Sequence, residues 1–142
     1  MGGLTFVDLN SESDYISLFC KEYGNAISTE DGFIVECKYP LATAKHICHG
    51  GKKNAPFQKA RAQRILWPKY ILSNPVERKV LIDNQTGYII FFFEKGKTAY
   101  AVVCSKLKNG NLNLTTGFLV DGKRAMAYRK GKQPYSFYPN KK

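Results

Sequence analysis

Residues 88–105 read YIIFFFEKGKTAYAVVCS, and this stretch decides the class of fold. Two runs rich in β-branched and aromatic residues, 88–94 and 98–105, are separated by a short turn that contains Gly96. Such runs are typical of strands, and a short connection with glycine favours antiparallel pairing of its neighbours. The first run, with its Ile-Ile-Phe-Phe-Phe core, is predicted to be a central, buried strand.

Strand patterns continue on both sides of this hairpin. They cover residues 79–83, 111–118 and 124–129, and each connection is short and contains glycine. The sequence therefore predicts an antiparallel meander of about five strands.

Helical signals precede the meander. Ser11 or Ser13 can cap a first helix that Gly24 ends, and Pro40 can begin a second helix that Gly50 ends after His49. A third helix is predicted over 55–66, a short turn over 69–74, and a possible short strand over 32–39. Because the helices come first and the strands last, we expect an α+β fold with N-terminal helices packed on a twisted antiparallel sheet.

Charge divides the chain of 142 residues, whose formal net charge is +11. Residues 1–40 hold two basic and seven acidic side chains, whereas residues 41–142 hold 20 basic and four acidic ones. We expect a single compact domain overall, in which 1–40 is an acidic accessory or linker segment and 41–142 is the basic functional part. Its charge predicts a polyanionic partner such as RNA.

No stretch has the length and apolarity of a membrane span, and the N-terminus lacks the pattern of a signal peptide. We therefore expect no membrane partner and a cytoplasmic site of action. The four cysteines form no CxxC pair, which argues against a structural zinc site. A cluster of Cys37 and Cys48 with the two histidines is the alternative, but we expect neither a metal nor another cofactor.

The two histidines of the chain, His46 and His49, lie three residues apart among lysines. That spacing places both on one face of a helix. Cleavage of RNA without metal needs a base for the 2′-hydroxyl, an acid for the leaving 5′-oxygen and cations for the transition state. Histidines surrounded by lysines supply all three, although a histidine near a helix C-terminus can also be structural.

Further candidate residues could bind the phosphates or bases of RNA. Thr115 and Thr116 precede Gly117 at the end of a predicted strand, where a hydroxyl could approach an anion. Alternation predicts that Leu114 and Thr116 share one face of that strand. The remaining candidates are cationic or aromatic side chains: Lys45, Arg61, Arg64, Lys69 and Arg78 for phosphates, and Trp67 and Tyr100 for stacking.

Several catalytic motifs are absent from the sequence. It contains no P-loop, GxSxG, HExxH or GxGxxG pattern, and its basic part has too few carboxylates for a two-metal nuclease. If the protein acts chemically on RNA, the composition favours a metal-independent route.

The order of these motifs resembles the superfamily of metal-independent ribonucleases that includes barnase, EndoU, colicins and RelE, in particular its phage-associated nuclease domains. The resemblance covers about residues 41–129 and rests on the segments 45–49, 61–75, 87–93, 99–104 and 114–118. It implies a toxin or effector ribonuclease that cleaves RNA, often tRNA, and is delivered as part of a larger secreted or phage protein. It further implies an immunity protein as a partner, which the basic charge predicts to be acidic.

Carried over to this sequence, the resemblance implies three roles. His46 or His49 would be the acid or base, Arg61 or Arg64 the phosphate-binding cation, and Thr115 or Thr116 the hydroxyl on the penultimate strand. Two alternatives stay open: a nucleic-acid-binding module without catalysis, and a basic protein-interaction domain.

Overall fold

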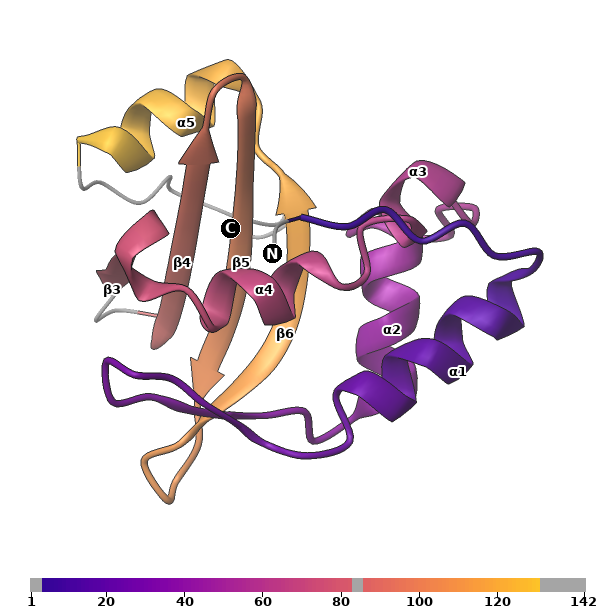
Figure 1. Cartoon of the computed structure of the whole chain (residues 1–142), viewed down its shortest axis with the longest axis horizontal. Coiled ribbons are helices and arrows are strands. Elements are labelled where there is room, and N and C mark those ends of the chain that lie inside the picture. The colour runs from indigo at the N-terminus through magenta and orange to yellow at the C-terminus, as the bar shows by residue number, and fades with distance from the viewer. Residues whose placement is uncertain (1–3, 83–85, 131–142) are drawn as a thin grey trace.

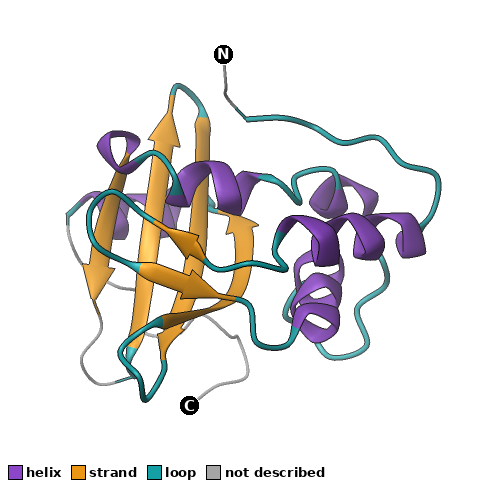
Figure 2. Cartoon of the chain, turned by 60° about the horizontal axis from the view of Figure 1, so that its bottom comes forward, coloured by secondary structure: helices purple, strands orange, loops and turns teal. Residues whose placement is uncertain are grey.

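The structure is a computed structural model that describes residues 4–82 and 86–130. Figures 1 and 2 show α1, α2 and α3 grouped beside the β6 side of one sheet, while α4 crosses a face of that sheet. In chain order the elements are α1 (Glu12–Glu22), β1 (Ile27–Ser28), β2 (Ile34–Glu36), α2 (Pro40–His49), α3 (Lys59–Ala62), α4 (Trp67–Leu72), the 3-10 helix η1 (Pro75–Glu77), β3 (Arg78–Ile82), β4 (Tyr88–Lys95), β5 (Thr98–Lys106), β6 (Leu112–Leu119) and α5 (Gly122–Arg129).

The sheet has six strands in the order β1-β2-β6-β5-β4-β3. The predicted meander is confirmed from β3 to β6, whose neighbours are all antiparallel. The short strand expected within 32–39 is also present, as β2, but it pairs parallel to β6 through Val35 and Leu112. The α+β class is therefore confirmed, with a curled, mixed sheet instead of a purely antiparallel one.

The strand expected over 124–129 is wrong, because this segment is the helix α5. The Asp121 carboxylate accepts a hydrogen bond from the Arg124 backbone N–H at 2.8 Å, as an N-cap does. Ala125 and Tyr128, three positions apart, are buried on the sheet. This spacing fits a helix, and the alternation of apolar residues in the sequence was misleading.

The predicted boundaries of the first two helices are confirmed. Ser11 caps α1, and α2 begins at Pro40 and is followed by Gly50 at φ 96°, a conformation that favours glycine. The helix expected over 55–66 is shorter, because regular helix extends only over α3. Pro68 lies in the first turn of α4, where a missing N–H is tolerated. None of the helices in the described ranges is long and apolar enough to cross a membrane.

Apolar side chains fill both faces of the sheet. The larger core lies beneath α1, α2 and α4 and includes Tyr15, Trp67 and Phe91. The smaller core lies beneath α5 and includes Phe92 and Tyr128. The acidic segment 1–40 thus contributes side chains to the same core as the basic part. The division of one compact domain into an accessory segment 1–40 and a functional part 41–142 stays a prediction.

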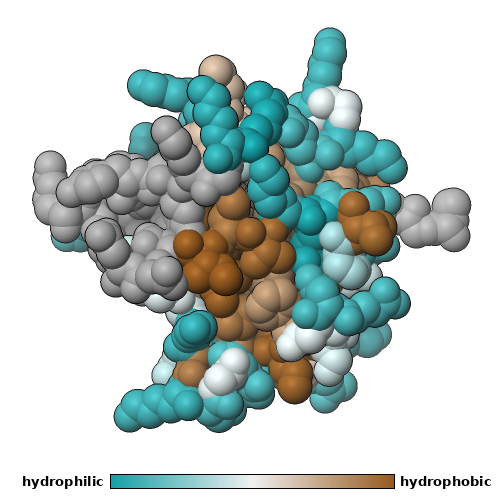
Figure 3. Space-filling view, turned by 90° about the vertical axis from the view of Figure 1, so that its left-hand side faces the viewer, coloured by the Kyte–Doolittle hydropathy of each residue, from teal (hydrophilic) through white to brown (hydrophobic). Residues whose placement is uncertain are grey.

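The β3 edge of the sheet faces the viewer in Figure 3, where apolar side chains gather in a patch bordered by polar ones. Val76 and Ile82 lie just before β3 and at its end, and they are 94% and 56% exposed. Exposed apolar residues therefore flank the edge strand that ends the sheet order.

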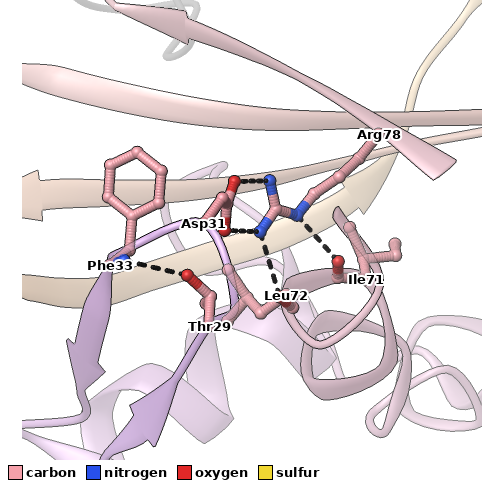
Figure 4. Close-up of polar contacts among 6 residues, drawn as sticks. All are labelled: Thr29, Asp31, Phe33, Ile71, Leu72 and Arg78. Atoms are coloured by element: carbon pink, nitrogen blue, oxygen red, sulfur yellow. Dashed lines mark hydrogen bonds and ion pairs between the residues drawn. The ribbon is translucent and has the colours of Figure 1, made fainter. Parts of the chain in front are cut away.

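A buried arginine joins the β1–β2 loop to α4 and β3 (Figure 4). The Arg78 guanidinium pairs with both carboxylate oxygens of Asp31 at 2.8 Å and donates to the carbonyls of Ile71 and Leu72. Its side chain is 1% exposed and lies 4.6 Å from the centre of the Phe91 ring. Hydrogen bonding to Arg78 lowers the pKa of Asp31 to about 2. Arg78 therefore stabilises the fold and does not lie at the cavity described next.

Candidate functional site

A cavity of about 310 Å³ lies between α2 with its following loop, β6 and α5. Its lining combines both histidines with cations and one hydroxyl: His46, His49, Lys52, Arg61, Thr116 and Arg124. None of the described residues that line it is acidic. The cavity is therefore suited to an anion, and we call it the histidine cavity.

A β-bulge decides which of the two predicted threonines reaches this cavity. Val103 pairs with Thr116 but Cys104 pairs with Leu114, so that Thr115 is the extra residue of β6. The bulge moves Thr116 to the opposite face from Leu114, and the expectation that they share a face is wrong. Thr116 lines the histidine cavity, whereas the Thr115 hydroxyl donates to the carbonyl of Asn113 and Thr115 is not part of the lining.

The Thr116 side chain is a candidate hydrogen-bond donor to a ligand. Thr116 is 3% exposed, and its Oγ1 has no hydrogen-bond partner among the described residues. A buried hydroxyl without a partner is costly in a folded protein. A ligand in the cavity could supply the missing acceptor.

His46 is half-buried on α2, and its surroundings favour the neutral imidazole. Burial, followed by the nearby Arg61 guanidinium, lowers the pKa of His46 below its ordinary value of 6.5. At neutral pH this ring is therefore mainly unprotonated and can accept a proton.

His49 has different surroundings, because both ring nitrogens face oxygen acceptors. Nδ1 lies 2.9 Å from the carbonyl oxygen of Ala55 and Nε2 lies 2.8 Å from Oε2 of Glu12. Only the imidazolium carries a proton on each nitrogen and can donate to both. The bond to Glu12 is the main reason that the pKa of His49 is raised. His49 thus ties α1 and the loop after α2 together.

Arg61 reaches the cavity from α3, and its backbone contacts fix its position. Its Nε donates to the carbonyl of Ile47 at 2.7 Å, and Nη2 lies 3.5 Å from the carbonyl oxygen of Gly117. Burial lowers the pKa of the guanidinium. Arg61 thereby bridges α2 and β6 and presents a partly desolvated cation to the histidine cavity.

Arg61 also lines a second cavity of about 260 Å³, which continues along β6. Arg64, Tyr100 and Gly117 contribute to this second cavity, which shares Gln58, Arg61, Phe118 and Leu119 with the first. Tyr100 is 2% exposed and burial raises the pKa of its hydroxyl. We call this space the arginine cavity.

The other predicted residues lie outside both cavities. Trp67 is 3% exposed and its indole N–H donates to the carbonyl of Thr5 at 3.0 Å. The Lys69 ammonium pairs with Glu22 at 3.1 Å. Lys45 is exposed on α2 and lines neither cavity. The structure therefore gives Trp67 and Lys69, like Arg78, contacts within the fold.

Sequence reasoning included Lys52 among the lysines around the two histidines, but it missed Gln58 and Arg124 as lining residues. Gln58 donates from Nε2 to the carbonyl of His49 at 2.9 Å, and the Arg124 guanidinium carbon lies 5.5 Å from the centre of the Phe118 ring. Arg124 was hidden by the wrong strand assignment of α5. The signal that could have found it is Asp121, whose position three residues earlier is that of a helix cap.

Comparisons with known proteins give no information on function, so the function is inferred from the geometry of the cavities. No family model, curated protein or solved structure matches the chain. Within residues 4–82 and 86–130, no group of three or more histidine, cysteine or acidic side chains is placed to hold a metal ion. The described side chains at the cavity offer an imidazole, a hydroxyl and several cations.

Proposed function

We propose that the protein is a metal-independent endoribonuclease that cleaves RNA by attack of a 2′-hydroxyl on the adjacent phosphodiester. The observation that supports this proposal is the meeting of His46, Arg61 and Thr116 at one cavity whose described lining is free of acidic residues. These groups provide a base, a cation and a hydrogen-bond donor.

In this mechanism the neutral His46 ring takes the proton of the 2′-hydroxyl. The resulting oxygen attacks phosphorus, and the bond to the 5′-oxygen of the next nucleotide breaks. Negative charge develops on the phosphoryl oxygens, where Arg61 and the Thr116 hydroxyl can donate hydrogen bonds. Lys52 lines the same cavity, and its ammonium can give a proton to the departing 5′-oxygen, whereas both ring nitrogens of His49 already face Ala55 and Glu12. The products are a 2′,3′-cyclic phosphate and a 5′-hydroxyl.

The substrate and partner follow from the resemblance and the charge. We take tRNA as the leading substrate, because members of the similar superfamily often cleave it, with action in the cytoplasm as a toxin or effector. An acidic immunity protein that occupies the cationic cavity would be the matching inhibitor. Co-purification with such a protein would test this partner.

Incubation with total tRNA and with a generic single-stranded RNA in EDTA tests the activity. Discrete fragments with 2′,3′-cyclic phosphate ends are expected. The His46→Gln variant should lose at least about 100-fold in cleavage rate, as removal of a general base does. Lys97→Gln, a change at an exposed lysine that lines neither cavity, is the control and should cleave as the wild type does.

Two outcomes would overturn the proposal in different ways. Full activity of a folded His46→Gln variant would remove this base from the mechanism. Intact RNA with salt-dependent binding in a gel shift would favour the non-catalytic nucleic-acid-binding module.

The pH dependence of cleavage tests the role of His46 separately. Because the pKa of His46 lies below 6.5, the acidic limb of kcat/KM should fall below pH 6.5. Arg61 contributes to this lowering, so the residual activity of Arg61→Gln should show its acidic limb at higher pH. An acidic limb that stays at the same pH in Arg61→Gln would contradict the assignment.

A further inference from the structure

We infer that the arginine cavity binds a second phosphate of the RNA strand, one next to the phosphodiester that is cleaved. This inference rests on the proposed function, since it places the scissile phosphodiester in the histidine cavity. It gives the substrate a length requirement: a strand with two successive phosphates should bind better than one with a single phosphate.

The first argument is charge. Arg61 and Arg64 both line the arginine cavity, and none of its described lining residues is acidic. Arg61 is partly buried, and this burial lowers the pKa of its guanidinium because the charged form is less well solvated there. An anion bound in this cavity would be attracted by the positive charge of both guanidinium groups.

The second argument is an unused donor on Arg64. The guanidinium is held in place because Nη1 donates to the carbonyl of Ala60 at 2.6 Å, while its central carbon lies 5.1 Å from the ring centres of both Phe6 and Trp67. Its Nε is buried and has no hydrogen-bond partner among the described residues. A phosphate oxygen in the cavity is an acceptor that this unpaired donor lacks.

The third argument is continuity between the two cavities. They share Gln58, Arg61, Phe118 and Leu119, so the two cavities adjoin at the end of β6, where neighbouring phosphates of one strand can occupy them. The arginine cavity, at about 260 Å³, has more space than a phosphate alone needs, and Phe118 and Leu119 offer an apolar wall to a sugar.

A guanine base is the other ligand that an arginine could bind here, through its O6 and N7 atoms. A neutral base would leave the two guanidinium charges uncompensated, and this favours phosphate. The experiment must therefore separate an effect of phosphate from an effect of base.

Binding of uncleavable deoxynucleotides tests the second-phosphate site. The probes are d(TpT), which has one phosphate, and pd(TpT) and d(TpTp), which have one more at either end. They lack the 2′-hydroxyl nucleophile, and their binding can be followed by the NMR signal of the Trp67 indole, the only indole of the chain, which lies beside Arg64. One of the two longer probes should bind at least about tenfold more tightly than d(TpT).

The Arg64→Met variant keeps an apolar side chain over Trp67 but removes the charge and the Nε donor. It should reduce the gain from the added phosphate to less than about threefold. Lys59→Gln, which removes an exposed cation that lines neither cavity, is the matched control and should keep the full gain. If thermal melting shows that Arg64→Met does not fold, Arg64→Lys replaces it, because lysine keeps the charge without the Nε donor and should keep only part of the gain.

The outcomes distinguish this inference from the proposed function. Equal binding of all three probes would overturn the second-phosphate site, even if RNA is cleaved. Replacement of thymine by guanine in d(TpT) tests the base. If this replacement tightens binding and Arg64→Met removes the increase in affinity, the arginine cavity binds a base instead of a phosphate. A phosphate gain with intact RNA would preserve the site and refute the ribonuclease. In a cleaving enzyme, the same gain should appear in kcat/KM for pUpU or UpUp over UpU.

Discussion

His46 and His49 lie three residues apart on α2, yet their surroundings shift their pKa values in opposite directions. Burial and Arg61 lower the pKa of His46, whereas the bond to Glu12 raises that of His49. Sequence alone placed both rings in one basic segment and left their roles equivalent. The difference depends on Glu12, which comes from a distant part of the chain.

The His49 contact predicts a dependence of stability on pH. A pKa raised in the folded state means that the contact contributes fully below the unfolded pKa, about 6.5, and that this contribution is lost as the pH rises through the higher folded value. The free energy of unfolding of the wild type should therefore exceed that of His49→Gln most at about pH 5.5. The difference should shrink toward pH 8.5 in urea unfolding experiments.

Glu12→Gln is the control for this prediction, because it removes the carboxylate that raises the pKa of His49. Its stability relative to the wild type should show the same trend between about pH 5.5 and pH 8.5. A difference between wild type and His49→Gln that grows with pH would show that His49 is neutral in the folded protein.

Among the elements, β6 depends on a close contact between Gly117 and Tyr100. A Cβ atom at Gly117 would lie 2.6 Å from the Tyr100 hydroxyl oxygen and 2.9 Å from Cε2. Tyr100 is 2% exposed and its ring packs against Trp67 at 5.2 Å between ring centres, so Gly117→Ala must displace the strand or this packed ring. We expect a loss of about 1–3 kcal/mol in the free energy of unfolding, as overpacking causes.

The same displacement should also lower cleavage, because Thr116 precedes Gly117 and the Gly117 carbonyl faces Arg61. Gly122→Ala is the matched control: a Cβ there meets no atom within 4 Å. Urea unfolding and the tRNA cleavage assay should distinguish the two variants. Equal stability of both would contradict the close contact between β6 and Tyr100.

Elements defined by local signals were predictable from the sequence, and elements defined by distant contacts were not. Pro40 and Gly50 sufficed to bound α2, and glycine-containing turns sufficed for the strands from β3 to β6. The parallel pairing of Val35 with Leu112 joins residues far apart in the chain, and no local pattern records it. The bulge at Thr115 is similarly invisible in a sequence that alternates regularly, which explains why the choice between Thr115 and Thr116 stayed open.

On the scale of the whole molecule, the acidic segment pairs with three cations that lie away from the histidine cavity and with His49, which lines it. Among the described residues, four ion pairs connect this segment to the basic part: Asp8 with Lys59, Glu12 with His49, Glu22 with Lys69 and Asp31 with Arg78. Lys52 and Arg61 of the histidine cavity belong to none of these four pairs. The arrangement leaves positive charge concentrated where we propose that RNA binds.

The acidic segment also supplies buried side chains, and this predicts that residues 41–142 do not fold alone. Tyr15, Phe19 and Tyr23 are each at most 2% exposed. Loss of a buried aromatic side chain costs about 3–5 kcal/mol, and a domain has only about 5–15 kcal/mol of stability in total. Removal of residues 1–40 would also remove Asp31, the carboxylate that pairs with the Arg78 guanidinium.

Urea unfolding followed by circular dichroism should therefore show a cooperative transition for the full chain and none for 41–142. A full-length variant with Asp8→Asn, Glu22→Gln and Glu30→Gln tests whether the acidic segment stabilises the fold through its charges or through its buried side chains. It removes three acidic charges and keeps every aromatic side chain. It should unfold cooperatively, at somewhat lower urea concentration than the wild type, since exposed ion pairs contribute little. A cooperative transition of 41–142 would instead establish the basic part as an independent domain, with the acidic segment as an accessory to it.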